Sequence, residues 1–367
     1  MQYIHERLEW PRFEWNLERL AGLLATVRHK QGLLLGRMGA LGFAVQAEAG
    51  LETLTEDVVK SSAIEGERLD STLVRSSLAR RLGIDIGGTA LVNRHIDGIV
   101  EMMLDATQRY AEPLSEGRLI GWHAALFPTG FSGSRKITVG AWRTPEAGAM
   151  QVVSGYVGRE MIHFEAPSAE RLEREMDAFL EWFNTPLEFD PVLKAGIAHL
   201  WFVTIHPFED GNGRIARAIA DCALARADNS PQRFYSMSGR IEQDRKEYYA
   251  ILESTQKGGL DITAWLEWFL TCLGRAIDGA EETLAAVLRK ARVWNHANQF
   301  PLNERQRLVL ARLLDNFSGK LTSSKYAKLA KISQDTAIRD IKELVANGIL
   351  KQSGGGGRST AYEIVVL

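Results

Sequence analysis

Apolar residues recur every three or four positions along most of this chain, and this spacing constrains its fold more than any other feature. An α-helix places residues three and four apart on one face, whereas a strand needs alternation with a period of two. The first such segment, residues 15–43, carries leucines at positions 17, 20, 23, 24, 33 and 34. The same spacing predicts helices over residues 53–65, 93–110, 169–183, 191–204, 214–226, 243–255, 262–273 and 281–294. The chain is therefore expected to be mainly α-helical.

Residues 127–167 interrupt this pattern. The segment is rich in Gly, Ser, Val and Pro, and it contains short β-like pieces at residues 137–139, 152–153 and 161–164. Loops this long inside a compact domain are usually functional. We therefore expect a long functional loop that carries a β-hairpin.

Pro301 separates a C-terminal part that has a pattern of its own. Helices are expected there over residues 303–317, 322–331 and 335–347, then strands at residues 349–351 and 361–366 around a glycine-rich tip at residues 354–357. Three helices and a two-stranded wing predict a winged helix-turn-helix domain. The predicted parts are an N-terminal helical region (1–92), a central domain (93–298) and the winged-helix domain (299–367).

Composition excludes several classes of protein. The 367 residues hold 44 Lys plus Arg and 46 Asp plus Glu, a net charge of −2, so no global basic field points to nucleic acid. Residues 1–10 are charged and lack the apolar core of a signal peptide, and no apolar run approaches the ~20 residues that cross a bilayer. Cys222 and Cys272 form no Cys-x-x-Cys pair, which argues against a disulfide framework or zinc ribbon. We expect a cytoplasmic protein that does not bind membranes.

The densest group of chemically active side chains lies at residues 206–217, which read His-Pro-Phe-Glu-Asp-Gly-Asn-Gly-Arg-Ile-Ala-Arg. Gly211 and Gly213 permit a sharp turn directly before a predicted helix. Main-chain amides at a helix N-terminus, strengthened by the helix dipole, form an anion site. Arg214 and Arg217 lie one turn apart at the start of that helix, and their guanidinium groups suit phosphate oxygens.

Two further side chains of this stretch suit phosphate chemistry. Asp210 precedes the turn, where a carboxylate can hold a Mg²⁺ ion that bridges phosphates. His206 lies four residues earlier, and its near-neutral pKa suits an imidazole that takes a proton from an incoming hydroxyl. Each residue alone has an ordinary explanation, as a core histidine, a solvated charge or a plain turn. Their combination within twelve residues favours a site that binds a nucleoside triphosphate.

Two other interpretations stay open on the residues alone. Gly211, Gly213 and Ala216 fit the loose dinucleotide fingerprint, but the flanking sequence is helical rather than βαβ. That fingerprint also leaves the histidine, the aspartate and the second arginine unexplained. A metal site could use His199 and His206, whose seven-residue spacing fits one helix face, but no further cluster of ligands accompanies them. The sequence has no Gly-x-x-x-x-Gly-Lys-Ser/Thr loop.

Eight positions of this stretch resemble the Fic-family motif without departure: His206, Phe208, Asp210, Gly211, Asn212, Gly213, Arg214 and Arg217. Fic proteins are mostly helical, and they typically transfer AMP from ATP to a hydroxyl group of a protein. The resemblance implies that residues 93–298 form a Fic helical core in which His206 is the base, Phe208 a buried anchor and Asp210 the Mg²⁺ ligand. It also implies that the two glycines hold the α- and β-phosphates with help from the Asn212 side chain. The two arginines would reach the β- and γ-phosphates.

The surroundings extend the resemblance. Residues 150–166 would be the β-hairpin flap that aligns a target segment by strand addition, and its residues nearest the nucleotide would be Val157, Gly158, Arg159 and Glu160. Tyr248, Tyr249 and Gln256 lie where the family places its nucleoside pocket, and a tyrosine ring can stack on adenine. The alternative is that the tyrosines belong to the core. Residues 10–43 resemble an N-terminal helical segment that often accompanies bacterial Fic domains.

The sequence Ser-Ser-Ala-Ile-Glu-Gly at residues 61–66 resembles the inhibitory-helix motif of Fic proteins, Ser/Thr-x-x-x-Glu-Gly/Asn. In that helix, about residues 53–66, Glu65 would pair with Arg217 through a charge-assisted bond. Ser61 would hydrogen-bond within the arrangement, and Gly66 would end the helix. The pair would occupy the arginine that the γ-phosphate needs and misalign the α-phosphate for attack. The alternative is an exposed glutamate at a helix end.

The expected reaction is transfer of AMP from MgATP to Ser, Thr or Tyr hydroxyls of an unidentified target protein, and of the chain itself, by a homodimer. The winged helix carries basic residues that suit DNA phosphates, namely Lys325, Lys328, Lys331, Arg339, Lys342, Lys351 and Arg358. Asp335, Asp340 and Glu343 weaken that case, and winged helices also serve as protein-interaction modules. Two alternatives stay open: a DNA-binding regulator with a silenced Fic domain, and a related Fic reaction such as removal of AMP.

Overall fold

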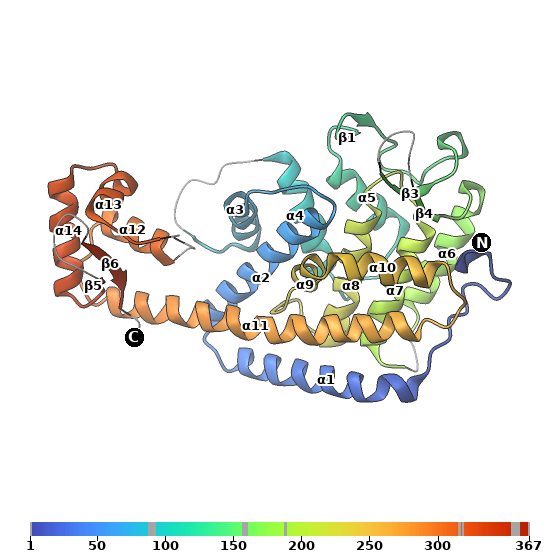
Figure 1. Cartoon of the computed structure of the whole chain (residues 1–367), viewed down its shortest axis with the longest axis horizontal. Helices are drawn as coiled ribbons and strands as arrows, with labels where there is room; N and C mark the ends of the chain where they lie inside the picture. The colour runs from blue at the N-terminus through green and yellow to red at the C-terminus, as the bar shows by residue number, and fades with distance from the viewer. Residues whose placement is uncertain are drawn as a thin grey trace. The chain divides into compact units, whose positions relative to one another are not determined.

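In the computed structural model the chain is built mainly of helices, which confirms the predicted fold class (Figure 1). The structure describes residues 2–86, 93–155, 161–186, 189–314, 317, 319–353 and 360–365. Two compact units divide the chain, Met1–Glu281 and Glu282–Leu367. None of the helices in these described ranges is both long and apolar enough to span a bilayer.

The N-terminal helices differ in their bounds from the prediction. After a short 3-10 helix, η1 (Ile4–Glu6), come α1 (Leu17–Gly39) and α2 (Phe43–Ile64). The predicted helix over residues 15–43 therefore ends early, and the one over 53–65 begins ten residues sooner, because the chain turns between Gly39 and Phe43. An unpredicted helix, α3 (Ser71–Leu82), follows, and its first turn is capped by the side chain of Asp70.

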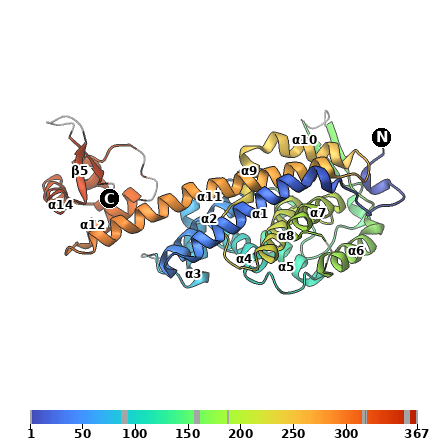
Figure 2. The ribbon, with the colours of Figure 1, turned by 90° about the horizontal axis from the view of Figure 1, so that it is seen from below.

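Helix α11 (Thr263–Ala297) is continuous, so the prediction of two separate helices at residues 262–273 and 281–294 is wrong. In unit 1, α1 lies beside the first part of α11 and runs in the same direction (Figures 1 and 2). Ion pairs between Arg19 and Glu267 and between Lys30 and Asp278, each 2.7 Å, follow this contact. This part of α11 contains Gly274 and Gly279, and glycine has poor helix propensity. Packing against α1 thus helps to keep the stretch helical.

The centre of unit 1 is a helical core. It comprises α4 (Arg94–Gln108), α5 (Glu116–Leu126), α6 (Leu172–Asn184), α7 (Pro191–Ile205) and α8 (Asn212–Asp228). Every residue of α7 from Val192 to Ile205 except Lys194 is buried, as expected for a helix that is apolar on all sides. Helix α5, which the spacing did not predict, packs so closely on α4 that a Cβ on Gly98 would lie 1.9 Å from the Ala125 carbonyl.

The predicted loop over residues 127–167 carries two hairpins. Strands β1 (Phe131–Ser132) and β2 (Arg135–Lys136) form the first, and β3 (Gln151–Ser154) and β4 (Met161–Glu165) the second, which contains a bulge. The predicted β-like piece at residues 137–139 is not a strand. Short 3-10 helices η2 (Pro145–Ala147) and η3 (Ala169–Arg171) flank the second hairpin, while α9 (Met237–Gln243) and α10 (Arg245–Gln256) follow the core, joined at Asp244.

The second unit has its own hydrophobic core. Helices α12 (Glu304–Leu314), α13 (Ser323–Ala330) and α14 (Gln334–Ala346) precede the antiparallel strands β5 (Leu350–Ser353) and β6 (Ala361–Ile364). This is the element order that a winged helix requires. Asp340, one of the acids that weaken the case for DNA binding, is buried and accepts hydrogen bonds from Arg305 and Tyr326. The predicted glycine tip and Arg358 lie outside the described residues.

Candidate functional site

The predicted motif forms the loop that joins α7 to α8. Helix α7 ends at His206, whose backbone is left-handed (φ 53°), and α8 begins after Gly211, which is left-handed as well (φ 83°). A side chain at Gly211 would be strained by this φ, and its Cβ would lie 2.9 Å from the ring of Phe127. Only glycine therefore fits position 211. The tight loop that it permits lets α7 pack closely on α8.

Two hydrogen bonds between the Asn212 side chain and the main chain of Phe208 close the loop. The Phe208 amide donates to Asn212 Oδ1 (2.9 Å), and Asn212 Nδ2 donates to the Phe208 carbonyl (2.8 Å). Phe208 itself is fully buried and stacks on His123, with ring centroids 4.1 Å apart, next to Trp142. Both polar groups of the Asn212 side chain therefore bind the loop in this structure, and its help in holding phosphate stays a prediction.

The ring of His206 is oriented by the end of α7. Its Nδ1 lies 3.1 Å from the Val203 carbonyl, which can only accept, so Nδ1 carries the proton and Nε2 keeps a free lone pair. Burial lowers the pKa of His206, and the Val203 carbonyl opposes this effect only in part. The imidazole is thus neutral at pH 7, which is the protonation state of a general base.

The N-terminus of α8 has no side-chain cap. A carboxylate from α2 stands there instead, because a Cβ on Gly213 would lie 2.2 Å from Glu65 Oε1 and 3.3 Å from Arg217 Nη1. Helix N-termini attract anions through their free amides and the helix dipole. Glu65 therefore occupies the position that the sequence assigned to phosphate.

Arg217 is held by the end of α2. Its Nη2 donates to Glu65 Oε1 (2.8 Å) and to the Ser61 carbonyl (2.9 Å), and its Nε donates to Ser61 Oγ (2.9 Å). Burial alone would lower the pKa of Arg217, but the Glu65 carboxylate and the Tyr248 ring outweigh it, and the pKa is raised. The guanidinium is 2% exposed and the Glu65 side chain 34%, so the pair is partly buried.

Arg214 has a carboxylate partner as well, which the sequence did not indicate. Its Nη1 donates to Glu67 Oε2 (3.0 Å), and its guanidinium lies 5.0 Å from the centroid of the Phe127 ring. Glu67 Oε1 binds His95 Nε2 from the first turn of α4. The hydrogen bond from His95 lowers the pKa of Glu67, and Arg214 adds to this effect. Glu67 is therefore ionised at neutral pH.

Asp210 lies beside the first hairpin. One carboxylate oxygen accepts the Gly211 amide (2.6 Å), and the other binds the hydroxyl of Ser132 in β1. Within the described ranges, no group of three or more His, Cys, Asp or Glu could hold a metal ion, and His199 Nε2 is bound instead to the Tyr248 hydroxyl (2.9 Å). The interpretation of His199 and His206 as a metal site thus has no support in this geometry.

The predicted nucleoside pocket divides into core and surface residues. Tyr248 and Gln256 are buried, and Gln256 donates to Thr204 of α7 (3.2 Å). Tyr249 is 37% exposed, and its hydroxyl lies 3.4 Å from the Ile64 carbonyl at the end of α2. Of the two predicted tyrosines, Tyr249 is therefore the one that offers a ring for stacking. The flap residues Val157, Gly158, Arg159 and Glu160 lie outside the described residues.

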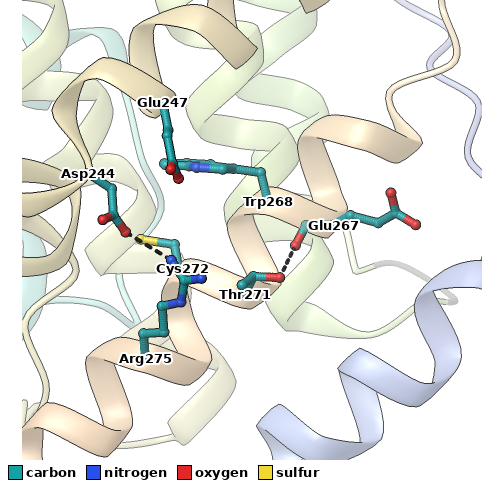
Figure 3. A pocket seen from close by; sticks show the side chains of 7 residues that line it. All are labelled: Asp244, Glu247, Glu267, Trp268, Thr271, Cys272 and Arg275. Atoms are coloured by element: carbon teal, nitrogen blue, oxygen red, sulfur yellow. Dashed lines mark hydrogen bonds and ion pairs between the residues drawn. The ribbon is translucent and has the colours of Figure 1, made fainter.

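A small hollow of about 170 Å³ lies away from this loop, where α10 begins beside α11. Figure 3 shows its lining, in which Arg275 contacts Asp244 at 3.2 Å and Thr271 donates to the Glu267 carbonyl. The hollow holds none of the predicted site residues, and Asp244 and Arg275 in its lining are paired with each other. The chemistry of the chain is concentrated instead at the loop between α7 and α8.

Comparison with known proteins agrees with this location. The Fic/DOC family model matches residues 113–224, and a domain of unknown function (DUF4172) matches residues 3–84. The protein adenylyltransferase Fic of Nematostella vectensis is 27% identical over 234 residues, 62% of this chain and 48% of that protein. The one of Culex quinquefasciatus is 26% identical over 272 residues, 72% of this chain and 50% of that protein. The chain spans about half the length of these relatives.

Solved structures show the same fold. A Fic family protein from Desulfovibrio desulfuricans matches with a TM-score of 0.52 and 20% identity, over 94% of this chain and 95% of that one. A Fic domain containing signaling protein from Bacteroides thetaiotaomicron matches with a TM-score of 0.51 and 21% identity, over 72% of this chain and 97% of that one. The region matched by the family model, residues 113–224, contains the whole loop described above, and the chain therefore carries a domain of the Fic family.

Proposed function

We propose that the chain transfers AMP from ATP to a hydroxyl group of a protein and that the end of α2 inhibits this reaction. The observation that carries the proposal is the loop between α7 and α8, where a neutral imidazole stands next to an uncapped helix N-terminus with two arginines. The curated relatives, named protein adenylyltransferases, support the same reaction.

In this proposal His206 is the general base. Its Nε2 accepts the proton of the attacking hydroxyl while the hydroxyl oxygen bonds to the α-phosphorus. The bond from that phosphorus to the bridging oxygen breaks, and pyrophosphate leaves with the electron pair. The Nδ1–H bond to Val203 keeps the ring in the tautomer that this step requires.

The phosphates would bind at the start of α8. The free first-turn amides face that position, and Arg217 Nη1 has no hydrogen-bond partner among the described residues. Mg²⁺ is usually bound by one or two carboxylates plus substrate phosphates, and Asp210 beside the Ser132 hydroxyl fits such a role. When bound, the ion would neutralise phosphate charge.

The inhibitory part of the proposal rests on competition for one place. Glu65 Oε1 lies over Gly213 and binds Arg217, so a carboxylate stands where a phosphate needs both the amides and the guanidinium. Since two negative charges in contact repel each other strongly, a phosphate and the Glu65 carboxylate cannot both occupy the place over Gly213. Removal of Glu65 is therefore expected to raise the rate of transfer.

The test is single-turnover transfer with the full chain and ATP that is labelled in the α- or the γ-phosphate. We expect Glu65→Gly to raise α-label incorporation about 10- to 100-fold, the range of one lost charge-assisted bond. His206→Ala in that background should lower it about 100-fold or more. His29→Ala, at an exposed histidine of α1, is the matched control and should leave the rate unchanged.

The label also separates the possible reactions. Incorporation of the γ-label would identify phosphorylation and contradict AMP transfer. Loss of AMP from a protein that already carries it, without incorporation, would identify removal of AMP. An unchanged rate in Glu65→Gly would remove the inhibitory role from the proposal.

A further inference from the structure

Arg143 is a buried cation without a carboxylate partner among the described residues. It lies in the loop between the two hairpins, and only 3% of the residue is exposed. Every hydrogen bond that its side chain makes in the described part of the structure goes to a main-chain carbonyl. Burial of an unpaired guanidinium is costly, so its position requires an explanation.

Two of these three bonds go to the end of α7, and the third goes to Pro167. Arg143 Nε donates to the His206 carbonyl (2.9 Å), and Nη2 lies between the carbonyls of Pro167 and Ile205. The Arg143 amide donates to the Pro207 carbonyl (2.9 Å). One residue thus binds three consecutive carbonyls around His206 and links them to the segment that follows β4.

The conformation of His206 depends on such support. A left-handed φ of 53° is uncommon for a residue with a side chain, and it persists only where the surroundings fix it. That conformation ends α7 and sets the direction in which the imidazole leaves the backbone. Without the guanidinium, the carbonyls of Ile205 and His206 would lose this donor at the point where the chain reverses.

We propose that Arg143 is a positioning residue for the transfer reaction, which fixes the backbone of His206 and thereby the direction of its imidazole. This inference rests on the proposed function, because Arg143 would affect the reaction only by orienting His206, the proposed general base. The guanidinium does not touch substrate and is not itself catalytic.

The positive charge of Arg143 has a second effect that can be measured. Three charged groups face His206 from the elements around it: Arg143 lowers the pKa of the imidazole, whereas Glu65 and Asp210 raise it. Burial lowers the pKa of Arg143 itself to about 10, so it stays charged at neutral pH. Removal of this charge is therefore expected to move the titration of His206 to higher pH.

The experiment compares Arg143→Gln and Arg143→Lys with a matched control, Arg226→Gln, in full-length Glu65→Gly protein. Arg226 is also partly buried and also donates to carbonyls, those of Tyr110, Phe183 and Glu112, but it lies at the far end of α8. The readouts are kcat and KM for ATP as a function of pH, and the titration of His206 by NMR of labelled histidine.

We expect Arg143→Gln to lower kcat about 10- to 100-fold, the effect of a base displaced by a fraction of an ångström to 1 Å, with a smaller change in KM. In Arg143→Gln, the acid limb of the plot of kcat against pH and the NMR titration of His206 should both move to higher pH. Arg143→Lys, which keeps the positive charge, should restore the position of the titration. Equal losses in Arg143→Gln and Arg226→Gln without a shift of the titration would overturn the inference. If Glu65→Gly protein transfers nothing, the proposed function fails, while the NMR titration still tests Arg143.

A different contact carries a second inference, that Glu67 holds Arg214 as Glu65 holds Arg217. Gly66 (φ 86°) ends α2 in a tight turn in which the Gly66 amide donates to the Ala63 carbonyl and the Glu67 amide to the Ser62 carbonyl. The glutamates on either side of this glycine therefore both reach the start of α8.

We infer that Glu67 is a second inhibitory carboxylate, fixed by His95 and placed on the first of the two motif arginines. Its ion pair leaves Arg214 with a neutralised guanidinium at the position where the proposed function needs a phosphate ligand. Glu65→Gly would then release only one of the two arginines.

The test is ATP binding by calorimetry together with transfer, in Glu65→Gly, Glu67→Gln and the double variant. We expect the double variant to bind ATP at least about threefold more tightly than Glu65→Gly, as for one partly exposed ion pair. Glu267→Gln, which loses an ion pair with Arg19 away from α8, is the control and should not change the affinity. Unchanged or weaker ATP binding in the double variant would show that Glu67 does not inhibit, whether or not AMP is transferred.

Discussion

At the scale of the residue, the buried imidazole of His199 makes folding sensitive to pH. His199 lies inside α7, and its Nε2 faces the Tyr248 hydroxyl of α10. Burial, with a smaller contribution from the nearby charge of Arg217, lowers the pKa of His199 to about 3. The unfolded chain has a histidine pKa near 6.5. Below that pH the unfolded state binds a proton that the folded state does not, so the free energy of unfolding must fall as the pH falls.

We expect His199 to remove about 1.4 kcal/mol of stability per pH unit between about pH 6 and pH 4. The measurement is the free energy of unfolding in denaturant at pH 7, 6, 5 and 4 for the full chain and for His199→Gln. The variant should be less stable at pH 7, because the amide fits the site less well, but its stability should depend less steeply on pH. Equal slopes for the two proteins would contradict this account.

Residues also differ in how far the sequence reveals their role. The motif at 206–217 is contiguous, so its glycines, arginines and histidine could be predicted as one site, and Glu65 followed from a short motif. Arg143 lies more than sixty residues from His206, as Ser132 does from Asp210, and nothing in local spacing connects either pair. The only signal was indirect: an arginine within a long Gly-rich loop that was expected to be functional.

At the scale of the element, the predicted bounds of a helix were accurate where its own apolar face sets its packing, and wrong where contacts with a distant helix do. Helices with a clear apolar face, such as α4 and α6, were found close to their observed bounds. The break expected near residue 275 was absent, because α1 packs along α11 and supplies the contacts that its glycines lack. The hydrogen bonds between Asn212 and the main chain of Phe208 were not predicted, because they depend on the folded shape of the loop.

At the scale of the whole molecule, the described residues proposed for catalysis and inhibition all belong to the first unit, Met1–Glu281. The second unit has a separate core, around Val309, Leu310, Ile341 and Leu344. A polar group lies within it: Asp340 accepts from Arg305 (3.1 Å), from Tyr326 (3.3 Å) and from Asn303 (3.3 Å). We therefore expect the two units to lose stability independently, although helix α11 belongs to both.

This independence can be tested with Asp340→Ala in full-length Glu65→Gly protein. Loss of the carboxylate leaves the buried Tyr326 hydroxyl and its neighbours without their acceptor, which should cost the second unit roughly 2–3 kcal/mol. Calorimetry should show one unfolding transition at lower temperature and the other unchanged, while transfer of AMP below that temperature keeps its rate. Asp335→Ala, at an exposed acid in the same helix, is the matched control. If Asp340→Ala abolishes transfer while the first unit stays folded, catalysis requires the second unit, because the described site residues would still be in place.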